Sequence, residues 1–291
     1  ILYSMRELGV SATASRVKSA KVIGETMGNY HPHGDVALYM TLVRMAQDFS
    51  LRYPLIDPQG NFGSIDGDAP AAMRYTECRL SPIAMEMLED IDRDTVDWMP
   101  NYDQTRQQPR VLPGKFPNFL CNGGEGIAVG MSTSVPPHNL KEVLEASLYM
   151  LDHPEANTED LLRFVPGPDF PTRALILGTK GAKEAYRTGR GKVIMQAQLQ
   201  IEPMEHGKNA IVITELPYQV NKAALVEHIA DLVRQKKVEG ITDINDFTDK
   251  HGMRVVIELR RDVMPRRIVN YLLKHTSMRQ TFGIIMLALV N

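Results

Sequence analysis

The sequence predicts an α+β protein of two domains that meet near residue 122. Three observations predict this class: two helical segments flank a short turn near the N-terminus, strand-like segments recur after Gly123, and further helices separate the later strands. A chain of 291 residues is long enough for two domains with separate cores. We therefore expect one domain over residues 1–122 and a second over residues 123–291.

The first domain is predicted to contain a helix-turn-helix. The first helix covers residues 17–27, and Gly28-Asn29 is a suitable C-cap pair after it. A His-Pro-His-Gly turn follows, and Asp35 can cap the second helix. Two helices across a short turn are typical of this motif. The side chains expected to be buried are Val17, Ala20, Ile23 and Met27 in the first helix, and Val36, Tyr39, Leu42, Val43 and Ala46 in the second.

A third helix is predicted after Ser81-Pro82, because serine is a good N-cap and proline fits the first helical position. Its expected apolar face is Ile83, Met87 and Ile91. The second domain alternates strands and helices, which indicates an α+β domain. The expected strands are 174–177, 192–198, 210–214 and 254–259, and the expected helices are 222–236 and 265–274.

The composition is that of an ordinary soluble globular protein, with 43% hydrophobic and 23% charged residues. No apolar run reaches transmembrane length and no secretory signal opens the chain, so we expect no membrane association. Cys78 and Cys121 share no motif spacing, which indicates neither a disulfide framework nor a zinc site and favours a cytoplasmic location. The chain starts at Ile1 and stops after an apolar segment, so we expect a part of a longer protein.

The net charge of −2 by itself disfavours nucleic-acid binding. The distribution of charge matters more, because Arg16, Lys18 and Lys21 are the only charged residues between Leu8 and Gly24. Lys18 and Lys21 are three residues apart and are expected to share a helix face that contacts phosphates. A helix-like stretch over residues 86–97 is strongly acidic. The alternative is that both are simply solvated helix faces.

Tyr75, next to Arg74, is the candidate nucleophile. A phenolate can attack a phosphodiester and can also leave again, so a tyrosyl ester can be made and reversed without outside energy. Arg74 would compensate the charge that builds on the phosphate oxygens. A lone tyrosine beside an arginine is otherwise nearly always structural.

His31 and His33 allow two interpretations from the residues alone. They can satisfy backbone groups in a turn, or they can form a metal-binding His-x-His pair, for which the rest of the sequence offers no suitable further ligands. Asp66-Gly67-Asp68 is a turn former rather than a metal site. The glycine-rich stretches 124–130 and 189–192 match neither a dinucleotide nor a Walker motif, so no nucleotide site is expected in this chain.

Several long motifs occur in order: YHPHGD (30–35), QGNFGSIDGD (59–68), AAMRYTE (71–77), GIAVGM (126–131), PPHNL (136–140), GPDFPT (167–172) and TELPYQVNKA (214–223). With them the chain resembles the breakage-reunion subunit of bacterial type IIA DNA topoisomerases, with the A subunit of DNA gyrase favoured over that of topoisomerase IV. The resemblance implies a winged-helix DNA-binding domain over 1–122 and a truncated α+β tower domain over 123–291.

That resemblance also implies roles for single residues. Tyr75 would form a 5′-phosphotyrosyl link, assisted by Arg74 and by His31 and His33, of which His33 is favoured for phosphate contact. Ile127 would be a wedge between base pairs that bends the duplex. The family's quinolone-sensitive members carry a serine and an acidic residue where this chain has Val36 and Met40, and neither side chain here can hydrogen-bond a water on a drug-bound metal ion.

The resemblance finally implies partners and a reaction. The substrate would be double-stranded DNA, and Mg²⁺ and ATP would be bound by a gyrase B-like partner subunit. The active form would be a homodimer of this chain within an A2B2 heterotetramer, catalysing ATP-dependent strand passage through a transient double-strand break. The alternative is a non-enzymatic DNA-bending, architectural module of the same fold.

Overall fold

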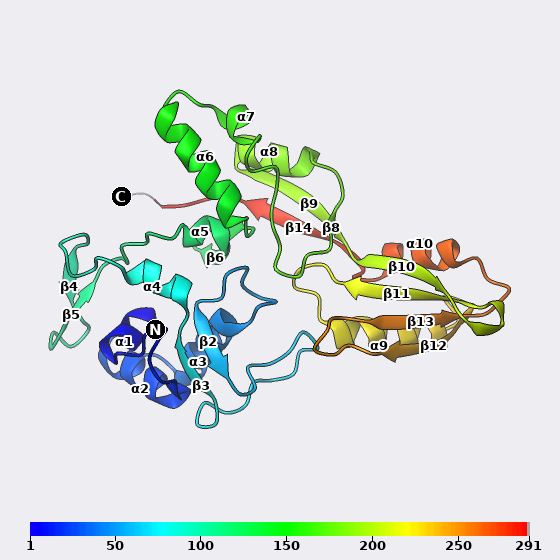
Figure 1. Ribbon diagram of the computed structural model, residues 1–291, viewed down its shortest axis with the longest axis horizontal. Helices are drawn as coiled ribbons and strands as arrows, with labels where there is room; N and C mark the ends of the chain where they lie inside the picture. Colours follow the sequence, from blue (N-terminus) through cyan, green and yellow to red (C-terminus); the bar gives the residue numbers. More distant parts are fainter. Residues whose placement is uncertain (290–291) are drawn as a thin grey trace. The chain divides into compact units, whose positions relative to one another are not determined.

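The computed structural model describes residues 1–289, and it confirms a mixed α+β protein built from small antiparallel sheets (Figure 1). The chain forms two compact units. Unit 1 consists of Ile1–Ser64 and Asp68–Gly123, and unit 2 consists of Ile65–Gly67 and the chain from Gly124 onward. The change of unit after Gly123 lies one residue beyond the boundary expected from the sequence, but the sequence gives no sign that residues 65–67 belong with unit 2.

Unit 1 combines short helices with a three-stranded antiparallel sheet in the order β1-β3-β2. Its elements are α1 (Leu2–Glu7), β1 (Val17–Lys18), α2 (Ser19–Asn29), α3 (Asp35–Ala46), β2 (Ile56–Gln59), β3 (Glu77–Leu80), α4 (Pro82–Leu88), β4 (Trp98–Pro100), β5 (Gln107–Pro109) and α5 (Asn118–Cys121). Both cysteines are free and buried in this unit.

Helix α2 starts later than the sequence predicts. Val17 pairs with Cys78 of β3, so it lies in a strand, and the helix begins at Ser19. Val22, Ile23 and Thr26 are buried, whereas Met27 is exposed. The expected Gly28-Asn29 cap is also wrong, because the helix runs through both residues and ends at Asn29 without a left-handed residue.

Helix α3 has the expected buried face except at one residue. Tyr39, Leu42, Val43 and Ala46 are buried together with Leu38. The sequence places Val36 on this face, but its side chain, in the first turn of the helix, is 71% exposed. The N-cap is Gly34 rather than Asp35, whose carboxylate accepts a bond from the Val36 N–H.

Helix α4 confirms the predicted cap, since the Ser81 hydroxyl accepts a hydrogen bond from Ala84 N and Pro82 is the first helical residue. The helix ends at Leu88, however, so the acidic run that follows is a series of turns and not a helix face. Asp90 and Asp94 have left-handed backbones with φ of 62° and 58°, a conformation that no α-helix contains.

Unit 2 contains two antiparallel sheets, of five strands in the order β6-β7-β14-β9-β8 and of four strands in the order β10-β11-β13-β12. The strands predicted at 174–177, 192–198, 210–214 and 254–259 correspond to β8, β9, β11 and β13. The elements are β6 (Gly124–Ala128), β7 (Met131–Val135), α6 (Leu140–Asp152), α7 (Thr158–Leu161), β8 (Leu175–Ile176), α8 (Lys180–Thr188), β9 (Arg190–Gln196), β10 (Gln198–Pro203), a 3-10 turn (Glu205–Gly207), β11 (Asn209–Glu215), α9 (Lys222–Arg234), β12 (Ile241–Asp246), β13 (Val255–Leu259), α10 (Pro265–His275) and β14 (Arg279–Ile285).

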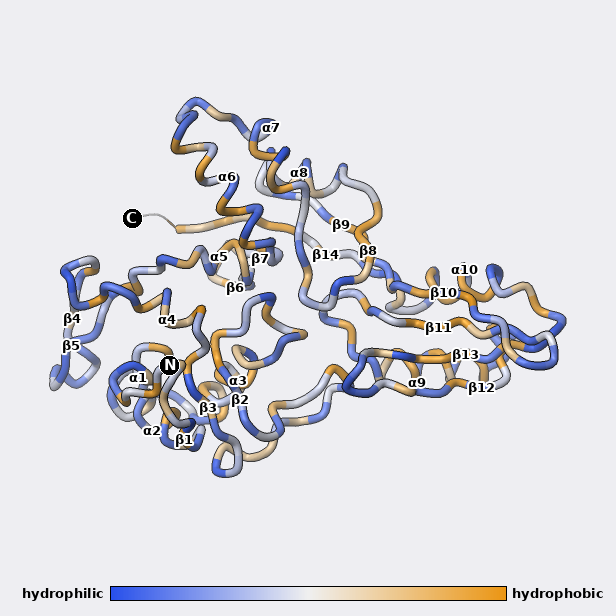
Figure 2. Tube along the Cα trace, viewed as in Figure 1, coloured by the Kyte–Doolittle hydropathy of each residue, from blue (hydrophilic) through white to orange (hydrophobic). Residues whose placement is uncertain are grey.

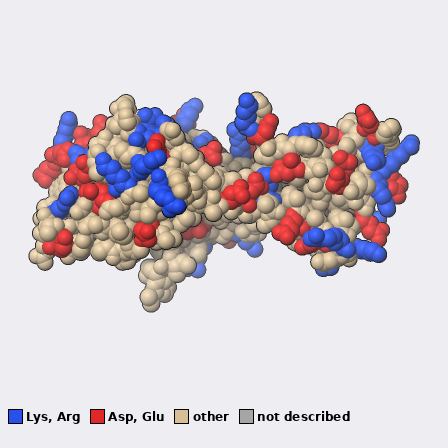
Figure 3. Space-filling model, turned by 90° about the horizontal axis from the view of Figure 1, so that it is seen from below, with Lys and Arg blue, Asp and Glu red and all other residues tan. Residues whose placement is uncertain are grey.

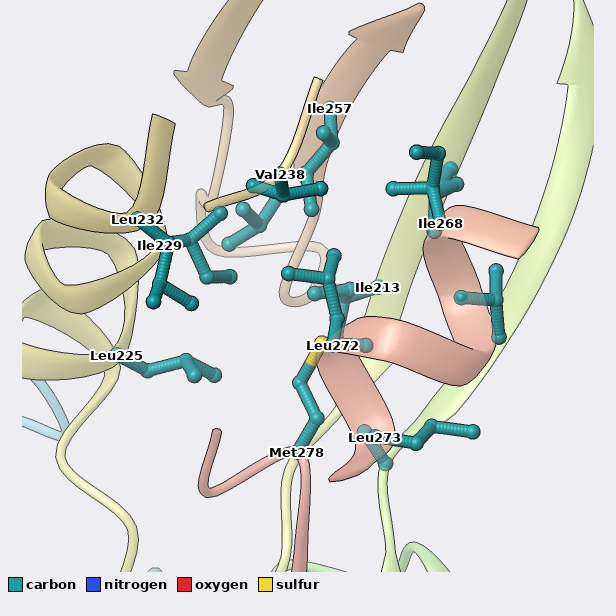
Figure 4. Close-up of a cluster of buried hydrophobic side chains, with 14 of the residues drawn as sticks. Ile213, Leu225, Ile229, Leu232, Val238, Ile257, Ile268, Leu272, Leu273 and Met278 are labelled. Carbon is teal, nitrogen blue, oxygen red and sulfur yellow. The ribbon is translucent and has the colours of Figure 1, made fainter. Parts of the chain in front are cut away.

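The main core of unit 2 lies between the four-stranded sheet and helices α9 and α10. Leu225, Ile229 and Leu232 project from α9 toward Ile268 and Leu272 of α10 (Figure 4). Ile213 of β11 and Ile257 of β13 complete the cluster, and both strands appear as hydrophobic stretches in Figure 2. In a strand every second residue faces the core, and in a helix the residues at i, i+3 and i+4 do so. The apolar faces of the sheet and of the two helices therefore form one core.

A buried lysine ties residues 65–67 to unit 2. The Lys222 side chain at the start of α9 is 1% exposed, and its ammonium lies 2.8 Å from Asp66 Oδ1 and also contacts Asp246. Lys222 N donates to the Ile65 carbonyl at 3.0 Å. Burial alone would lower the pKa of Lys222, but hydrogen bonds to Asp246 and Asp66 outweigh it and raise that pKa.

The surface carries both signs of charge. Figure 3 shows Lys and Arg side chains interspersed with Asp and Glu side chains on the face that it presents. Within residues 1–289, no helix is both long enough and apolar enough to cross a membrane.

Candidate functional site

Tyr75 lies in unit 1 on the loop that leads into β3. Its side chain is 64% exposed, and the Arg74 guanidinium covers one face of the ring, with Cζ 4.6 Å from the ring centroid. An exposed phenol on a short turn is accessible to a large substrate, and a cation against the ring adds positive charge where a phosphate would approach. The structure thus brings these two predicted residues together.

The loop that carries Tyr75 is closely attached to helix α2. Ser19 N donates to the Thr76 carbonyl at 2.9 Å, and Ala20 N donates to the Met73 carbonyl at 3.1 Å. These are N–H groups of the first helical turn, which have no partner inside the helix. The loop therefore serves as the cap of α2, and the backbone on both sides of Tyr75 is fixed.

His31 and His33 lie on the turn between α2 and α3. Their rings stack with centroids 4.2 Å apart, and both side chains are exposed. His31 N donates to the Thr26 carbonyl at 2.8 Å, and His33 N donates to the His31 carbonyl at 2.7 Å. The backbone of the turn is thus held by its own hydrogen bonds, which leaves both imidazoles facing solvent.

No metal site accompanies these histidines. In the part of the chain that the structure describes, no group of three or more His, Cys, Asp and Glu residues is arranged to hold a metal ion. That the catalytic Mg²⁺ is held by a partner subunit stays a prediction.

Arg16 has a different environment from the one predicted. Both Asp57 oxygens accept hydrogen bonds from Arg16 Nη2 at 2.9 Å, and Arg79 Nε donates to Asp57 Oδ2 at 2.6 Å. Burial alone would raise the pKa of the Asp57 carboxyl, but the two guanidinium groups outweigh it, and this pKa lies below its usual value. Arg16 thus shares the Asp57 carboxylate with Arg79, which leaves a net positive charge on this group, and its contact with a phosphate stays a prediction.

Lys18 and Lys21 do not share a helix face. Lys18 lies in β1, and its ammonium is 2.8 Å from Glu77 Oε1 of the neighbouring strand. Lys21 lies in the first turns of α2 with an exposed side chain. The expected shared helix face is wrong, because Val17 and Lys18 pair with β3, whereas phosphate binding by the two lysines stays a prediction.

Ile127 lies on the β6–β7 hairpin of unit 2. The hairpin turns at Val129-Gly130, where Gly130 has a φ of 79°. The Ile127 side chain is 95% exposed, and Val129 at the turn is fully exposed. Isolated exposed apolar residues are common, but these two lie at the turn of one hairpin and form an apolar tip that contributes nothing to the core.

Sequence reasoning missed the residues that support the site from inside. Behind the candidate loop lie the hydroxyls of Tyr39, Thr76 and Ser19. Beside Arg16 lies the carboxylate of Asp57. The sequence predicts Tyr39 only as an apolar core residue. A tyrosine at a buried helical position is the one signal that could have indicated a hydrogen-bond partner, because a buried phenol hydroxyl needs one.

The chain matches known proteins over its whole length. A family model for the A subunit of DNA gyrase/topoisomerase IV covers residues 1–291. The DNA gyrase A subunit of Halalkalibacterium halodurans is 54% identical over 291 residues, which are 100% of this chain and 35% of that protein. The DNA gyrase A subunit of Dehalogenimonas lykanthroporepellens is 55% identical to this chain, which covers 36% of that protein. The DNA gyrase A subunit of Pseudomonas aeruginosa is 54% identical, and the chain covers 32% of it.

The α+β units and the exposed Arg74-Tyr75 pair do not identify a family by themselves, whereas the match over residues 1–291 does. The chain belongs to the family of DNA gyrase and topoisomerase IV A subunits. It spans about a third of the length of the curated relatives that it matches.

Proposed function

We propose that this chain is the DNA-cleaving part of an ATP-dependent type II DNA topoisomerase, of the gyrase kind rather than the topoisomerase IV kind. The observation that carries the proposal is Tyr75, an exposed phenol on a fixed loop with the Arg74 guanidinium against its ring. The curated relatives quoted above, all of them named as the A subunit of DNA gyrase, favour gyrase over topoisomerase IV.

The proposed reaction is a reversible transesterification. The Tyr75 oxygen attacks a DNA phosphorus, a bond forms between that oxygen and the phosphorus of the 5′ phosphate, and the bond to the 3′ oxygen breaks. The phenol loses its proton and the departing 3′ oxygen gains one, so the step is balanced, and its reversal reseals the strand. Arg74, with His33 and then His31, stabilises the charge on the phosphate oxygens during transfer.

Unit 1 would be the winged-helix DNA-binding domain and unit 2 would belong to the tower domain. Double-stranded DNA would contact Lys18 and Lys21, while Ile127 on its hairpin would insert between base pairs and bend the duplex. Arg16, which also pairs with Asp57, would be a further phosphate contact. The protein would work in the cytoplasm.

The remaining chemistry would come from a partner. As the family resemblance implies, the Mg²⁺ and the ATP of the holoenzyme would be held by a gyrase B-like subunit. Two copies of this chain with two copies of that subunit would form an A2B2 heterotetramer, in which each Tyr75 cuts one strand.

The experiment uses the natural full-length protein, mixed with its ATPase partner subunit, Mg²⁺ and plasmid DNA, and stopped with detergent. We expect protein attached to DNA 5′ ends, and complete loss of these adducts in Tyr75→Phe. Tyr102→Phe is the matched control, because it removes a phenol hydroxyl that donates to the Gly28 carbonyl elsewhere in unit 1. Tight binding and bending without adducts in any of these proteins would instead favour the architectural module.

A further inference from the structure

Three buried side-chain hydroxyls lie behind the loop that carries Tyr75. Tyr39 is 8% exposed, and Thr76 and Ser19 are fully buried. The Tyr39 hydroxyl donates to the Ala71 carbonyl at 2.6 Å, and its oxygen lies 2.9 Å from Thr76 Oγ1. The Thr76 hydroxyl in turn donates to Ser19 Oγ at 2.9 Å. Because the Thr76 proton goes to Ser19, the single Tyr39 proton is shared between the Ala71 carbonyl and Thr76 Oγ1. These contacts link helix α3 to helix α2 through the loop.

The Tyr39 hydroxyl is not needed to fill space. Its ring packs at the buried face of α3, where phenylalanine would bury the same apolar surface. The buried hydroxyl instead fixes the positions of the groups that it bonds, because leaving it without a hydrogen-bond partner would cost free energy. Its partners here are Ala71 and Thr76, which bracket Tyr75 in the sequence.

We propose that Tyr39 is a positioning residue for the Tyr75 nucleophile, an inference that rests on the proposed function. The α2 backbone holds the loop at Met73 and Thr76, and the Tyr39 hydroxyl connects Ala71 at its start to Thr76 at its end. Without that hydroxyl, the segment 71–76 loses the side-chain hydrogen bonds that attach it to α3. The phenol of Tyr75 then samples positions away from the line of attack on phosphorus.

The expected effect is on the rate of chemistry and not on DNA affinity. Misplacing a reacting group by about 1 Å can cost a factor of roughly 100 in rate. DNA affinity depends mainly on phosphate contacts at the surface, and the buried hydroxyls make none. If the Tyr39 hydroxyl were purely structural, its removal would lower the melting temperature and the fraction of active enzyme. The molecules that stayed active would keep the normal rate.

The test measures single-turnover adduct formation by the full-length protein with its ATPase partner subunit, Mg²⁺ and a labelled duplex. For Tyr39→Phe we expect a rate constant lower by roughly 10- to 100-fold, with the final adduct amplitude and the duplex Kd unchanged. Tyr102→Phe is the matched control, since it also deletes a phenol hydroxyl bonded to a backbone carbonyl in unit 1, and it should react at the normal rate.

A second pair of variants keeps the inference testable if Tyr39→Phe does not fold. Thr76→Val removes the hydroxyl that faces Tyr39 and should slow adduct formation, whereas Thr76→Ser keeps the hydroxyl and should restore the rate. A normal rate constant in Tyr39→Phe, or in Thr76→Val, would overturn the proposal. So would an equal loss in Tyr102→Phe, or a loss seen only in amplitude.

The outcomes also separate this inference from the function on which it rests. If the unmodified enzyme forms adducts that disappear in Tyr75→Phe, the proposed function holds, and Tyr39→Phe decides the positioning role alone. If the unmodified enzyme forms no adducts, the proposed function fails and the positioning role fails with it.

Discussion

At the scale of single residues, exposure separates the candidate functional side chains from the structural ones. Tyr75 and Ile127 are large apolar or aromatic side chains with 64% and 95% of their surface exposed. Neither is needed for a core, so each can be changed with little loss of stability. Arg16 differs from them, because its half-buried guanidinium pairs with Asp57.

Replacing Ile127 by alanine should reduce DNA bending more than DNA affinity. A wedge residue unstacks two base pairs, which costs about a few kcal/mol per step, and the bend that results allows more contact between protein and DNA. DNA affinity, in contrast, depends mainly on contacts with the phosphates. Because the side chain is 95% exposed, the free energy of unfolding should change by less than about 0.5 kcal/mol. Energy transfer between labels at the two duplex ends, with the full-length enzyme, measures the bend.

Leu148→Ala is the control for this change, since Leu148 is an aliphatic residue of helix α6 in the same unit with 62% exposure. It should leave the bend as it is. An unchanged bend in Ile127→Ala would mean that the hairpin tip is not a wedge.

At the scale of elements, ion pairs join strands that the sequence cannot pair. Asp57 of β2 accepts hydrogen bonds from Arg79 of β3 and from Arg16, just before β1, and so links all three strands of the unit 1 sheet. Side-chain ion pairs therefore stabilise this sheet in addition to its backbone hydrogen bonds. Removing the carboxylate would leave two half-buried guanidinium groups without their anion.

Asp57→Asn should therefore destabilise the chain by about 2 kcal/mol at pH 7. The folded pKa of Asp57 is lowered, so its contribution is complete above the pKa of the unfolded chain, about 4, and is lost as the pH falls through the folded pKa. Urea unfolding at pH 7 and at pH 3 should show a difference from the parent that shrinks on acidification.

Asp90→Asn provides the comparison, because Asp90 makes an exposed pair with Arg93 at 3.2 Å, and asparagine tolerates its left-handed backbone. That change should cost less than about 0.5 kcal/mol. Equal losses in both variants, or a loss in Asp57→Asn that does not depend on pH, would contradict the assigned role of Asp57.

At the scale of the whole molecule, the candidate residues are divided between two compact units. Tyr75, Arg74 and the histidines belong to unit 1, and Ile127 belongs to unit 2, which also includes residues 65–67 through Lys222. The chain spans about a third of its curated relatives, so its activity is tested in the full-length assembly. The expected response to quinolones is also a property of the whole assembly, because it is measured as trapped cleaved DNA.

The assembled enzyme should be insensitive to quinolones that bind through a water on a metal ion. Val36 and Met40 lie four residues apart on the exposed side of α3, with exposures of 71% and 47%. Val36→Ser with Met40→Asp should restore hydrogen-bond acceptors and lower the quinolone concentration that traps cleaved DNA by about tenfold or more. Cleavage without drug should not change.

The control double variant, Val36→Ala with Met40→Leu, alters the same two positions without adding an acceptor. It should stay as insensitive as the parent. Unchanged insensitivity of the Ser/Asp variant would show that these two positions do not set the drug response.

The sequence by itself determined what depends on neighbouring residues and on long motifs. The α+β class, the Ser81-Pro82 helix start, the strands β8, β9, β11 and β13, and the family all follow from it. Tyr75 and Arg74 were also found from their motif, and their catalytic role stays a prediction.

Only the tertiary structure decided which side chains are committed to distant partners. Arg16 meets Asp57 across 41 residues and Tyr39 meets Thr76 across 37, while Val17 leaves the predicted helix to pair with Cys78 of β3. Local periodicity cannot reveal such contacts, because the free energy of an ion pair or a buried hydroxyl depends on a partner that the chain brings near only when it folds.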